Sequence, residues 1–536
     1  MTLQEREIDP PMATDIVEFA RSRWKGRVAV TLDEPAGLCR IETRVEDLRS
    51  VCEWIADERH YAFATLVVEE VPGPALSLNY VFYDATSPWI EVMVRPEGNL
   101  LPSMSDLAQG PSFDWHEREA EDLFGLRFQG HPRLGEFVLH EDWPEGVNPM
   151  RRSFDAARRT APREPHPAWQ PPMIVSAPGS FAMPIGPVFA DFAESAHFLL
   201  ETVGEDVIRT IPRFFYKYRG VEKIAERQAV DRVLLLAERF SGTAAFAHGL
   251  AFCQAVEAIC GTDVPPRAKA LRTILAELER LRHHAATITG ICNSTALAVA
   301  AAQAALLEEE LLRLTCEVAR HRYLFGALVP GGMSFDLDDA QCRRLLAACG
   351  DIAARLAHLH GQLRYSSSFL DRLEEVGIVS TEAARSYGLV GPIARASDVP
   401  RDIRKLRPYA AYEAADFALA VEREGDGYAR LRVFFREAEE ASSIIRQILT
   451  APPPGRVRSG PVDWRAGVAL VAVEAPSGAT FHWVRLNEDG TVARYRVTPP
   501  AFTNWHGFHL AAENFAFQDF PIILASFGLS NAECDR

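Results

Sequence analysis

The chain has 536 residues, of which 57 are Lys or Arg and 73 are Asp or Glu, so its formal net charge at pH 7 is -16. This length exceeds one ordinary hydrophobic core and predicts two domains, and the 48% of hydrophobic residues is typical of a packed globular protein. The acidic balance argues against broad contact with nucleic-acid phosphates, so we expect no nucleic-acid partner.

No apolar run reaches the roughly 18 residues that predict a membrane-spanning helix. The first residues include Glu5, Glu7 and Asp9 and lack the apolar segment of a secretion signal, which favours a cytoplasmic location. The nine cysteines never form a Cys-x-x-Cys pair, which argues against a zinc ribbon or a thioredoxin-type motif.

Residues 1–155 have the pattern of an α+β domain, because short β-type runs are separated by turn residues and flanked by stretches with helical spacing. The β-type runs cover 62–68, 76–83 and 89–94, and the helical stretches cover 14–23 and 116–124. Residues 156–180 contain six prolines and no hydrophobic periodicity, which predicts an extended linker.

Residues 181–536 predict a second, mainly α-helical domain with a small β-rich region at 467–497. The expected helices cover 221–237, 245–259, 266–288, 296–324, 340–366, 409–421 and 428–449. The fourth of these is expected to stop at Pro330-Gly331-Gly332, a helix-ending signal.

An unusual string of motifs lies at the end of the first domain: Trp115-His116-Glu117-Arg118-Glu119, Asp122-Leu123-Phe124-Gly125, Gly130-His131-Pro132 and Glu141-Asp142-Trp143. From the residues alone, its acids suit the solvated first turn of a helix that Gly125 ends. The string also closely resembles the C subunit of bacterial complex I and its fused counterpart in the formate-hydrogenlyase type of membrane-bound [NiFe]-hydrogenase.

Motifs of the second domain come in the order of the hydrogenase large subunit and of the complex I D subunit. They are Pro184-Ile185-Gly186-Pro187, Tyr218-Arg219-Gly220-Val221-Glu222-Lys223, Glu279-Arg280-Leu281, Pro330-Gly331-Gly332, Gly391 to Ser397, Tyr409, Gly425-Asp426, Glu474 to Gly478, Tyr495-Arg496 and Pro499-Pro500. The resemblance covers nearly the whole chain and implies a fused large subunit, with the fusion favouring the hydrogenase-like branch.

The family's nickel-iron centre is held by two Cys-x-x-Cys pairs, since soft thiolates suit such metals. By resemblance, Ser241 and Ala244 stand at the first pair, and Ser530 and Glu533 at the second. A slip of one residue would place Asn531 and Cys534 there instead. We therefore expect no nickel-iron centre, and no metal or cofactor held by this chain.

Complex I uses the equivalent cavity for quinone, where a His and a Tyr supply protons. The resemblance puts His197 at the His position, preceded by Glu194, whereas the Tyr position holds Gly242 and another polar position holds Phe189. A catalytic and a structural role for His197 both stay open, with a quinone as one candidate acceptor.

Two arginines are further candidates. Arg219 matches an arginine that lies against the [4Fe-4S] cluster of the adjoining small subunit, where a cation raises the cluster's potential; a surface salt bridge is its alternative. Arg395 lies between alanines, and a charge in apolar company needs a partner, so it is expected to line the pocket.

Several weaker candidates remain. Glu238, Arg239, His248 and His284 could form a polar path or merely a solvated helix face. The pairs His283-His284 and His358, His360 lack companions for a metal site, and no dinucleotide-binding or Walker A motif is present.

Three functions follow from the resemblance. The first is an oxidoreductase subunit that passes electrons to a non-nickel acceptor, with His197, Glu194 and Arg395 in the site. The second is a catalytically silent scaffold, and the third is a [NiFe]-hydrogenase. Expected partners are an iron-sulfur small subunit and integral membrane subunits, which would hold the chain on the inner face of the cell membrane.

Overall fold

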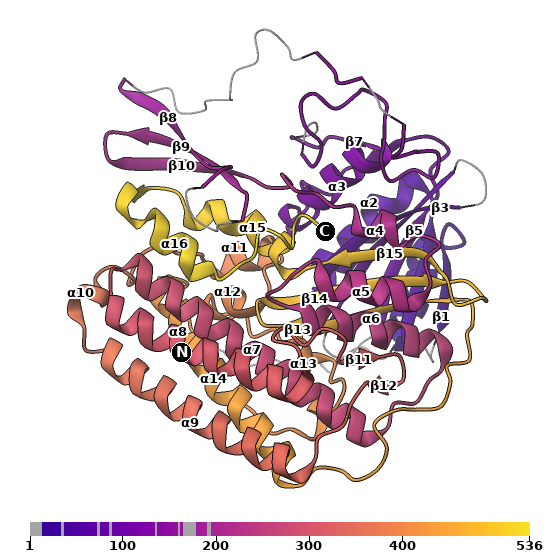
Figure 1. The fold of residues 1–536 in the computed structure, drawn as a ribbon. Coiled ribbons are helices and arrows are strands. Elements are labelled where there is room, and N and C mark those ends of the chain that lie inside the picture. The colour runs from indigo at the N-terminus through magenta and orange to yellow at the C-terminus, as the bar shows by residue number, and fades with distance from the viewer. Residues whose placement is uncertain are drawn as a thin grey trace, which may run out of the picture. The chain divides into compact units, whose positions relative to one another are not determined.

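The computed structural model describes residues 13–33, 37–71, 75–84, 88–133, 137–158, 161–164, 178–189 and 194–536. The chain divides into two compact units, Met1–Glu164 and Pro165–Arg536, each with its own colours in Figure 1. Much of the expected linker, at 159–160 and 165–177, lies outside the described residues, so its extended conformation stays a prediction.

A five-stranded sheet forms the centre of the first unit, in the order β1-β2-β5-β4-β3. Its strands are β1 (Ala29–Asp33), β2 (Leu38–Thr43), β3 (Ala62–Glu70), β4 (Leu76–Tyr83) and β5 (Trp89–Val94). Strands β2 and β5 are parallel and the other pairs are antiparallel. All side chains of β4 and β5 are buried. This burial on both faces explains why their apolar runs are longer than a simple alternation of apolar and polar residues would give.

Helices and two short strands complete the first unit. They are α1 (Ala13–Trp24), α2 (Val45–Glu53), the π-helix η1 (Trp54–Glu58), α3 (Pro111–Phe124), β6 (Leu100–Pro102) and β7 (Arg127–Gln129). The α+β class and the three expected strands are therefore confirmed.

The helix that carries the acidic motif differs from the expectation. It begins at Pro111, so Glu117 and Glu119 lie in its second and third turns instead of its first, and both are buried. Glu117 accepts hydrogen bonds from Ser103 Oγ (2.5 Å) and from the backbone N–H of Met104 (2.8 Å). The solvated position predicted for these acids is therefore wrong, whereas Gly125 does end the helix, with a φ of 72°.

The second unit is mainly helical. Its helices are α4 (Val221–Ala225), α5 (Val230–Arg239), α6 (Ala245–Cys260), α7 (Pro266–Ser294), α8 (Ala298–Ala319), α9 (Asp339–Leu363), α10 (Ser367–Leu370), α11 (Thr381–Ser386), α12 (Gly391–Ala396), α13 (Ile403–Leu406), α14 (Gly427–Thr450), α15 (Pro500–Ala511) and α16 (Phe520–Phe527), with 3-10 turns η2 (Tyr412–Ala414) and η3 (Phe517–Asp519). Helices α7, α8, α9 and α14 lie side by side (Figure 1). None of the helices in the described ranges has the length and hydropathy of a membrane span.

Three small sheets accompany these helices. The expected β-rich region forms the antiparallel sheet β13 (Gly467–Ala475), β14 (Gly478–Leu486) and β15 (Val492–Thr498), against which α6 packs. A second sheet was not predicted from the sequence: β8 (Ser180–Ile185), β9 (His197–Val203), β10 (Asp206–Arg213) and β16 (Phe515–Ala516), in the order β16-β10-β9-β8. The third pairs β11 (Leu328–Val329) with β12 (Gly332–Met333).

Three expected helices end or break elsewhere. The stretch 221–237 splits into α4 and α5, because Arg227 adopts a φ of 64°. Helix α8 stops at Ala319, with Arg320 in the left-handed region, well before Pro330. The helix expected at 409–421 is reduced to η2, where the Tyr412 hydroxyl donates to the buried Glu277. Tertiary contacts therefore override the helical spacing there.

Candidate functional site

Ser241 and Glu533, which stand at two expected cysteine positions, lie in direct contact. Ser241 Oγ donates to Glu533 Oε1 at 2.8 Å, although 292 residues separate them. Thr243 Oγ1 donates to the same oxygen at 3.2 Å, and the backbone N–H of Ala501 donates to Oε2 at 3.3 Å. Ser241 and Glu533 are both fully buried. The two segments in which the sequence analysis expects the metal-ligand positions therefore meet here through a carboxylate and hydroxyls.

The loop after α5 carries Ser241 and ends at Ala244, the N-cap residue of α6. An alanine cannot cap a helix, because it has no side-chain acceptor. Glu279 of α7 does so instead, accepting the backbone N–H groups of Phe246 (2.7 Å) and Ala247 (3.0 Å). Burial raises the pKa of Glu279 to about 7, against the lowering effect of Arg282 and these two hydrogen bonds.

Ser530, the third expected cysteine position, bonds to the predicted site residue Glu194. Its hydroxyl lies 3.0 and 2.9 Å from the two carboxylate oxygens of Glu194, and the backbone N–H of Ala532 donates to the same carboxylate at 2.9 Å. The structure therefore brings Glu194 to the turn that also carries Glu533.

The donor set does not suit a thiolate-bridged metal centre. The four positions where the resemblance predicts thiolates hold hydroxyls, a methyl group and a carboxylate, which are not soft sulfur ligands, and the Ser241 hydroxyl donates to Glu533. Across the described ranges, no three His, Cys, Asp or Glu side chains are grouped to hold a metal ion. Cys534 is fully buried, and burial holds the pKa of its thiol well above the usual value, which disfavours a thiolate ligand.

His197 opens β9 and is partly exposed. It lies opposite Arg213 of β10, and burial, followed by the charge of Arg213, lowers the pKa of the imidazole. The next residue, Phe198, packs on Trp505, whose indole N–H donates to the carbonyl of Ser530 at 3.3 Å. Within the described ranges no hydrogen bond joins His197 to Glu194, so their joint role in proton transfer stays a prediction.

Arg219 holds the last turn of the chain to the loop after α5. Its guanidinium donates to the carbonyl oxygens of Asp535 (2.9 Å), Phe240 (2.7 Å) and Ala532. Burial lowers its pKa, opposed by Asp535 and Glu194. Arg219 therefore stabilises the contact between these two segments. Its position near the iron-sulfur cluster of a partner stays a prediction.

Arg395 lies in a separate, fully buried ion cluster. It bonds to Glu437 (2.7 Å) and Glu474 (2.8 Å), and Asp402 lies 3.3 Å away. Among the hydrogen bonds of the described residues, none joins Arg395 to Ser241 or Glu533. The expected partner of this charge is therefore found, while its place in a pocket stays a prediction.

The weaker candidates do not form one path. Glu238 accepts the backbone N–H of Gly326, Arg239 lies over the Phe325 ring at 5.3 Å, and His284 bonds to Glu437 at 3.0 Å. His248 alone lies beside the Ser241–Glu533 contact, with Nε2 3.7 Å from Glu533 Oε1.

Sequence reasoning missed Glu279, His482 and Tyr495 as parts of this site. His482 contacts His248 at 3.1 Å across 234 residues, and Tyr495 contacts His482 at 2.9 Å. Local spacing carries no signal for such pairs, although Glu279 and Tyr495 do lie within motifs that carry the family resemblance.

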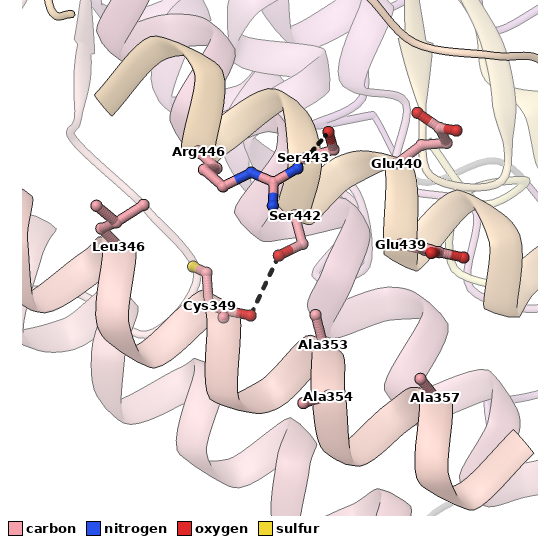
Figure 2. Close-up of a pocket in the computed structure, with 11 residues that line it drawn as sticks. Leu346, Cys349, Ala353, Ala354, Ala357, Glu439, Glu440, Ser442, Ser443 and Arg446 are labelled. Atoms are coloured by element: carbon pink, nitrogen blue, oxygen red, sulfur yellow. Dashed lines mark hydrogen bonds between the residues drawn. The ribbon is translucent and has the colours of Figure 1, made fainter. Parts of the chain in front are cut away.

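A groove of about 360 Å³ lies between α9 and α14, as Figure 2 shows. Small residues of α9, among them Ala353 and Ala357, face Glu439 and Arg446 of α14, and Ser442 Oγ donates to the carbonyl of Cys349 at 3.2 Å. None of the predicted site residues lines this groove.

Comparisons with known families match both units. Residues 41–160 match the family "Respiratory-chain NADH dehydrogenase, 30 Kd subunit", and residues 300–463 and 461–536 match "Respiratory-chain NADH dehydrogenase, 49 Kd subunit". Together with the α+β unit and the helical unit, these matches define a fusion of two oxidoreductase subunit types.

Individual relatives narrow the class. Formate hydrogenlyase subunit 5 of Escherichia coli (strain K12) is 30% identical over 456 residues, which are 84% of this chain and 80% of the relative. Hydrogenase-4 component G of the same organism is 28% identical over 84% of this chain and 78% of its own. The fused C/D protein of the NADH-quinone oxidoreductase of Acinetobacter baumannii (strain AYE) is 27% identical over 83% and 82%. The chain belongs to this family of fused C/D-type subunits shared by complex I and hydrogenases.

Proposed function

We propose that this chain is the fused large subunit of a membrane-attached oxidoreductase that passes electrons to an acceptor other than a nickel-iron centre. The observation that carries the proposal is the contact between Ser241 and Glu533, in which a buried carboxylate joins the two segments where the resemblance expects thiolates. A carboxylate surrounded by hydroxyls can exchange protons with a reduced organic acceptor, and a quinone is one candidate.

The proposed partners are those that the family resemblance implies. An iron-sulfur small subunit would deliver electrons from a [4Fe-4S] cluster near Arg219, where a cation stabilises the reduced cluster. Integral membrane subunits would hold the chain on the inner face of the cell membrane. His197 and Glu194 are the proposed proton-handling residues at the mouth of the site, and Glu194 already contacts Ser530.

A catalytically silent scaffold is the second candidate function, and one observation favours it. The polar side chains at the substituted positions bond to protein partners, Ser241 to Glu533 and Ser530 to Glu194. Such mutual bonding would let the pocket serve as a rigid joint between segments without any acceptor.

Metal analysis of the purified native complex tests whether the chain holds a nickel-iron centre. We expect iron from the small subunit and no stoichiometric nickel, because oxygen donors do not replace four thiolates at such a centre. Nickel near one atom per chain would overturn the proposal and support a hydrogenase.

Replacement of His197 by alanine separates the acceptor site from the scaffold. We expect His197→Ala to lower electron transfer roughly hundredfold in an intact complex, as the loss of a proton donor does. His358→Ala, at an exposed position of α9, is the matched control and should leave the rate unchanged. Equal rates for both variants would favour the scaffold.

A further inference from the structure

A row of buried side chains leads from Glu533 through the interior of the second unit. His248 Nε2 lies 3.7 Å from Glu533 Oε1, His248 Nδ1 lies 3.1 Å from His482 Nε2, and His482 Nδ1 lies 2.9 Å from the Tyr495 hydroxyl. All four side chains have an exposed fraction of 0%. Bulk water therefore does not compete for the contacts between these side chains.

Four separate segments fix this row. His248 lies in the first turn of α6, His482 on β14, Tyr495 on β15 and Glu533 in the last turn of the chain. In the β14–β15 register His482 pairs with Val497, so His482 and Tyr495 are diagonal neighbours on one face. Aromatic rings close both sides: Phe240 lies 4.3 Å from the His248 ring and Phe252 lies 5.4 Å from the Tyr495 ring.

Burial decides the protonation states of Tyr495 and His482, at the inner end of the row. Burial, followed by the charges of Glu222 and Cys253, holds the pKa of the Tyr495 hydroxyl well above its usual value, so it keeps its proton. Burial and His248 hold the pKa of His482 well below its usual value, so this imidazole is neutral. A neutral imidazole offers one N–H donor and one acceptor nitrogen.

The numbers of donors and acceptors along the row then select one direction in which its hydrogen bonds are donated. Among the described residues, the Tyr495 hydroxyl has His482 Nδ1 as its hydrogen-bond partner, at 2.9 Å. If Tyr495 donates to Nδ1, the proton of His482 must sit on Nε2 and is donated to His248 Nδ1. The proton of His248 then sits on Nε2 and faces Glu533 Oε1 at 3.7 Å, a charge-pair distance that is longer than a hydrogen bond. Within the part of the chain that the structure describes, the opposite direction would leave the Tyr495 proton without an acceptor and turn a lone pair of His248 Nε2 toward the Glu533 carboxylate. Thr480 Oγ1, at 3.3 Å, is a further partner of His248 Nδ1.

We propose that Tyr495 and His482 are positioning residues that hold His248 with its proton on Nε2, and that His248 in turn presents this N–H to Glu533, the proton-exchanging carboxylate of the acceptor pocket. This proposal rests on the proposed function, which places the acceptor beside Ser241 and Glu533. In each cycle Glu533 takes up one proton from water and releases it to the reduced acceptor, while the electrons come from the partner cluster. The two histidines and Tyr495 are not consumed.

Imidazole nitrogen NMR of the purified complex, with ¹⁵N-labelled histidine in this subunit, tests the assignment directly. The His248 signals are identified by their loss in His248→Gln. We expect the wild-type spectrum to show His248 protonated at Nε2, and Tyr495→Phe to shift its proton toward Nδ1. Tyr365→Phe, at an exposed position of the chain, is the matched control and should change nothing. Protonation at Nδ1 in the wild type would overturn the proposal, and it can be seen even if Tyr495→Phe fails to fold.

Electron-transfer assays separate this proposal from the proposed function. We expect Glu533→Gln and His248→Gln to lower the rate roughly hundredfold and to change its solvent deuterium isotope effect. If the NMR result holds but both variants keep the wild-type rate, the acceptor site is wrong and the proton-exchange role is overturned with it. If both variants lose activity but His248 is protonated at Nδ1, the acceptor site stands and the positioning by Tyr495 is overturned.

Discussion

Glu533 joins two segments that lie far apart in the sequence, the loop after α5 and the last turn of the chain. An ionised carboxylate only accepts hydrogen bonds, and its surroundings supply matching donors: the hydroxyls of Ser241 and Thr243 and the backbone N–H of Ala501. A buried carboxylate without such donors would carry a large desolvation cost. The donors around Glu533 therefore offset the cost of burying its carboxylate.

Removing the Ser241 hydroxyl tests this joint. We expect Ser241→Ala to lower the free energy of unfolding of the second unit by about 1–3 kcal/mol, because a buried hydrogen bond to a charged group is lost. Denaturant titration measures the change. Ser22→Ala, at an exposed position of α1, should lie within about 0.5 kcal/mol of the wild type. An equally small effect at Ser241 would contradict the role of Glu533.

Glu117 makes the first unit sensitive to alkaline pH. Burial raises its pKa from the ordinary value of 4.5 to about 8, so the folded chain binds the proton more tightly than the unfolded chain. Its stabilising contribution is complete below about pH 4.5 and is lost as the pH rises through about 8. Glu117→Gln cannot ionise, so its unfolding temperature should fall less than that of the wild type over this range.

Thermal unfolding followed by circular dichroism on both sides of this pH range measures the difference. Glu97→Gln, at an exposed position after β5, is the control and should follow the wild-type curve. Parallel curves for Glu117→Gln and the wild type would show that Glu117 is ionised in the folded chain.

The last turn of the chain behaves as a structural element because Arg219 holds it. Removing the guanidinium leaves the carbonyl oxygen of Ala532 without this donor and leaves that of Asp535 with the backbone N–H of Arg219. We therefore expect Arg219→Ala to raise the hydrogen-exchange rate of the amides in 531–535 about tenfold or more, since each lost bond costs about 1 kcal/mol. Arg232→Ala, at an exposed position of α5, should leave these rates unchanged.

Elements with strong local signals could be predicted from the sequence, and those decided by distant contacts could not. The run at 76–83 became β4 with the same bounds, and 428–449 lies within α14, because both have clear periodicity and clear ends. The stretch 409–421 failed because Tyr412 reaches the buried Glu277, which is 135 residues away. The same reason hid the contact of His248 with His482, whereas Glu194 and Glu533 were singled out through the family resemblance, and their roles stay predictions.

At the scale of the second unit, a buried ion cluster joins α7, α12, α13, α14 and β13. Arg395 neutralises Glu437 and Glu474 at its centre, and the charge of Arg395 helps to lower the pKa of Glu437 to about 2 despite burial. A carboxyl group with a lowered pKa stabilises the fold above its ordinary value of 4.5, and this stability is lost as the pH falls toward 2. The pairing of Glu437 with Arg395 therefore stabilises the unit at neutral pH, and this contribution is lost in acid, whereas burial raises the pKa of Glu474 in the same cluster.

Arg395→Met tests this role. We expect a loss of about 3–5 kcal/mol in the free energy of unfolding, because buried carboxylates lose their counter-charge. The acid midpoint of unfolding should also move to a higher pH. Arg423→Met, at a position with 86% of its side chain exposed, is the control and should change neither quantity. If Arg395→Met unfolds like the control, Arg395 is free for a role in the pocket.

For the whole molecule, the proposed attachment through partner subunits predicts how the chain fractionates. It should sediment with cell membranes in the intact complex and be released by alkaline carbonate without detergent. The net charge of -16 favours release by carbonate. Anionic lipid headgroups repel an acidic surface, so the chain needs partner proteins to attach to the membrane. Retention in the membrane after carbonate treatment would contradict the proposed attachment.

The contact between Ser241 and Glu533 also bears on how the subunit is made. Both partners are encoded amino acids, so the joint between the loop after α5 and the last turn can close as soon as the chain collapses. Maturation would then require no nickel delivery and no accessory insertion proteins. A cell starved of nickel should accumulate this subunit, correctly folded, at the same level as a cell with an ample supply.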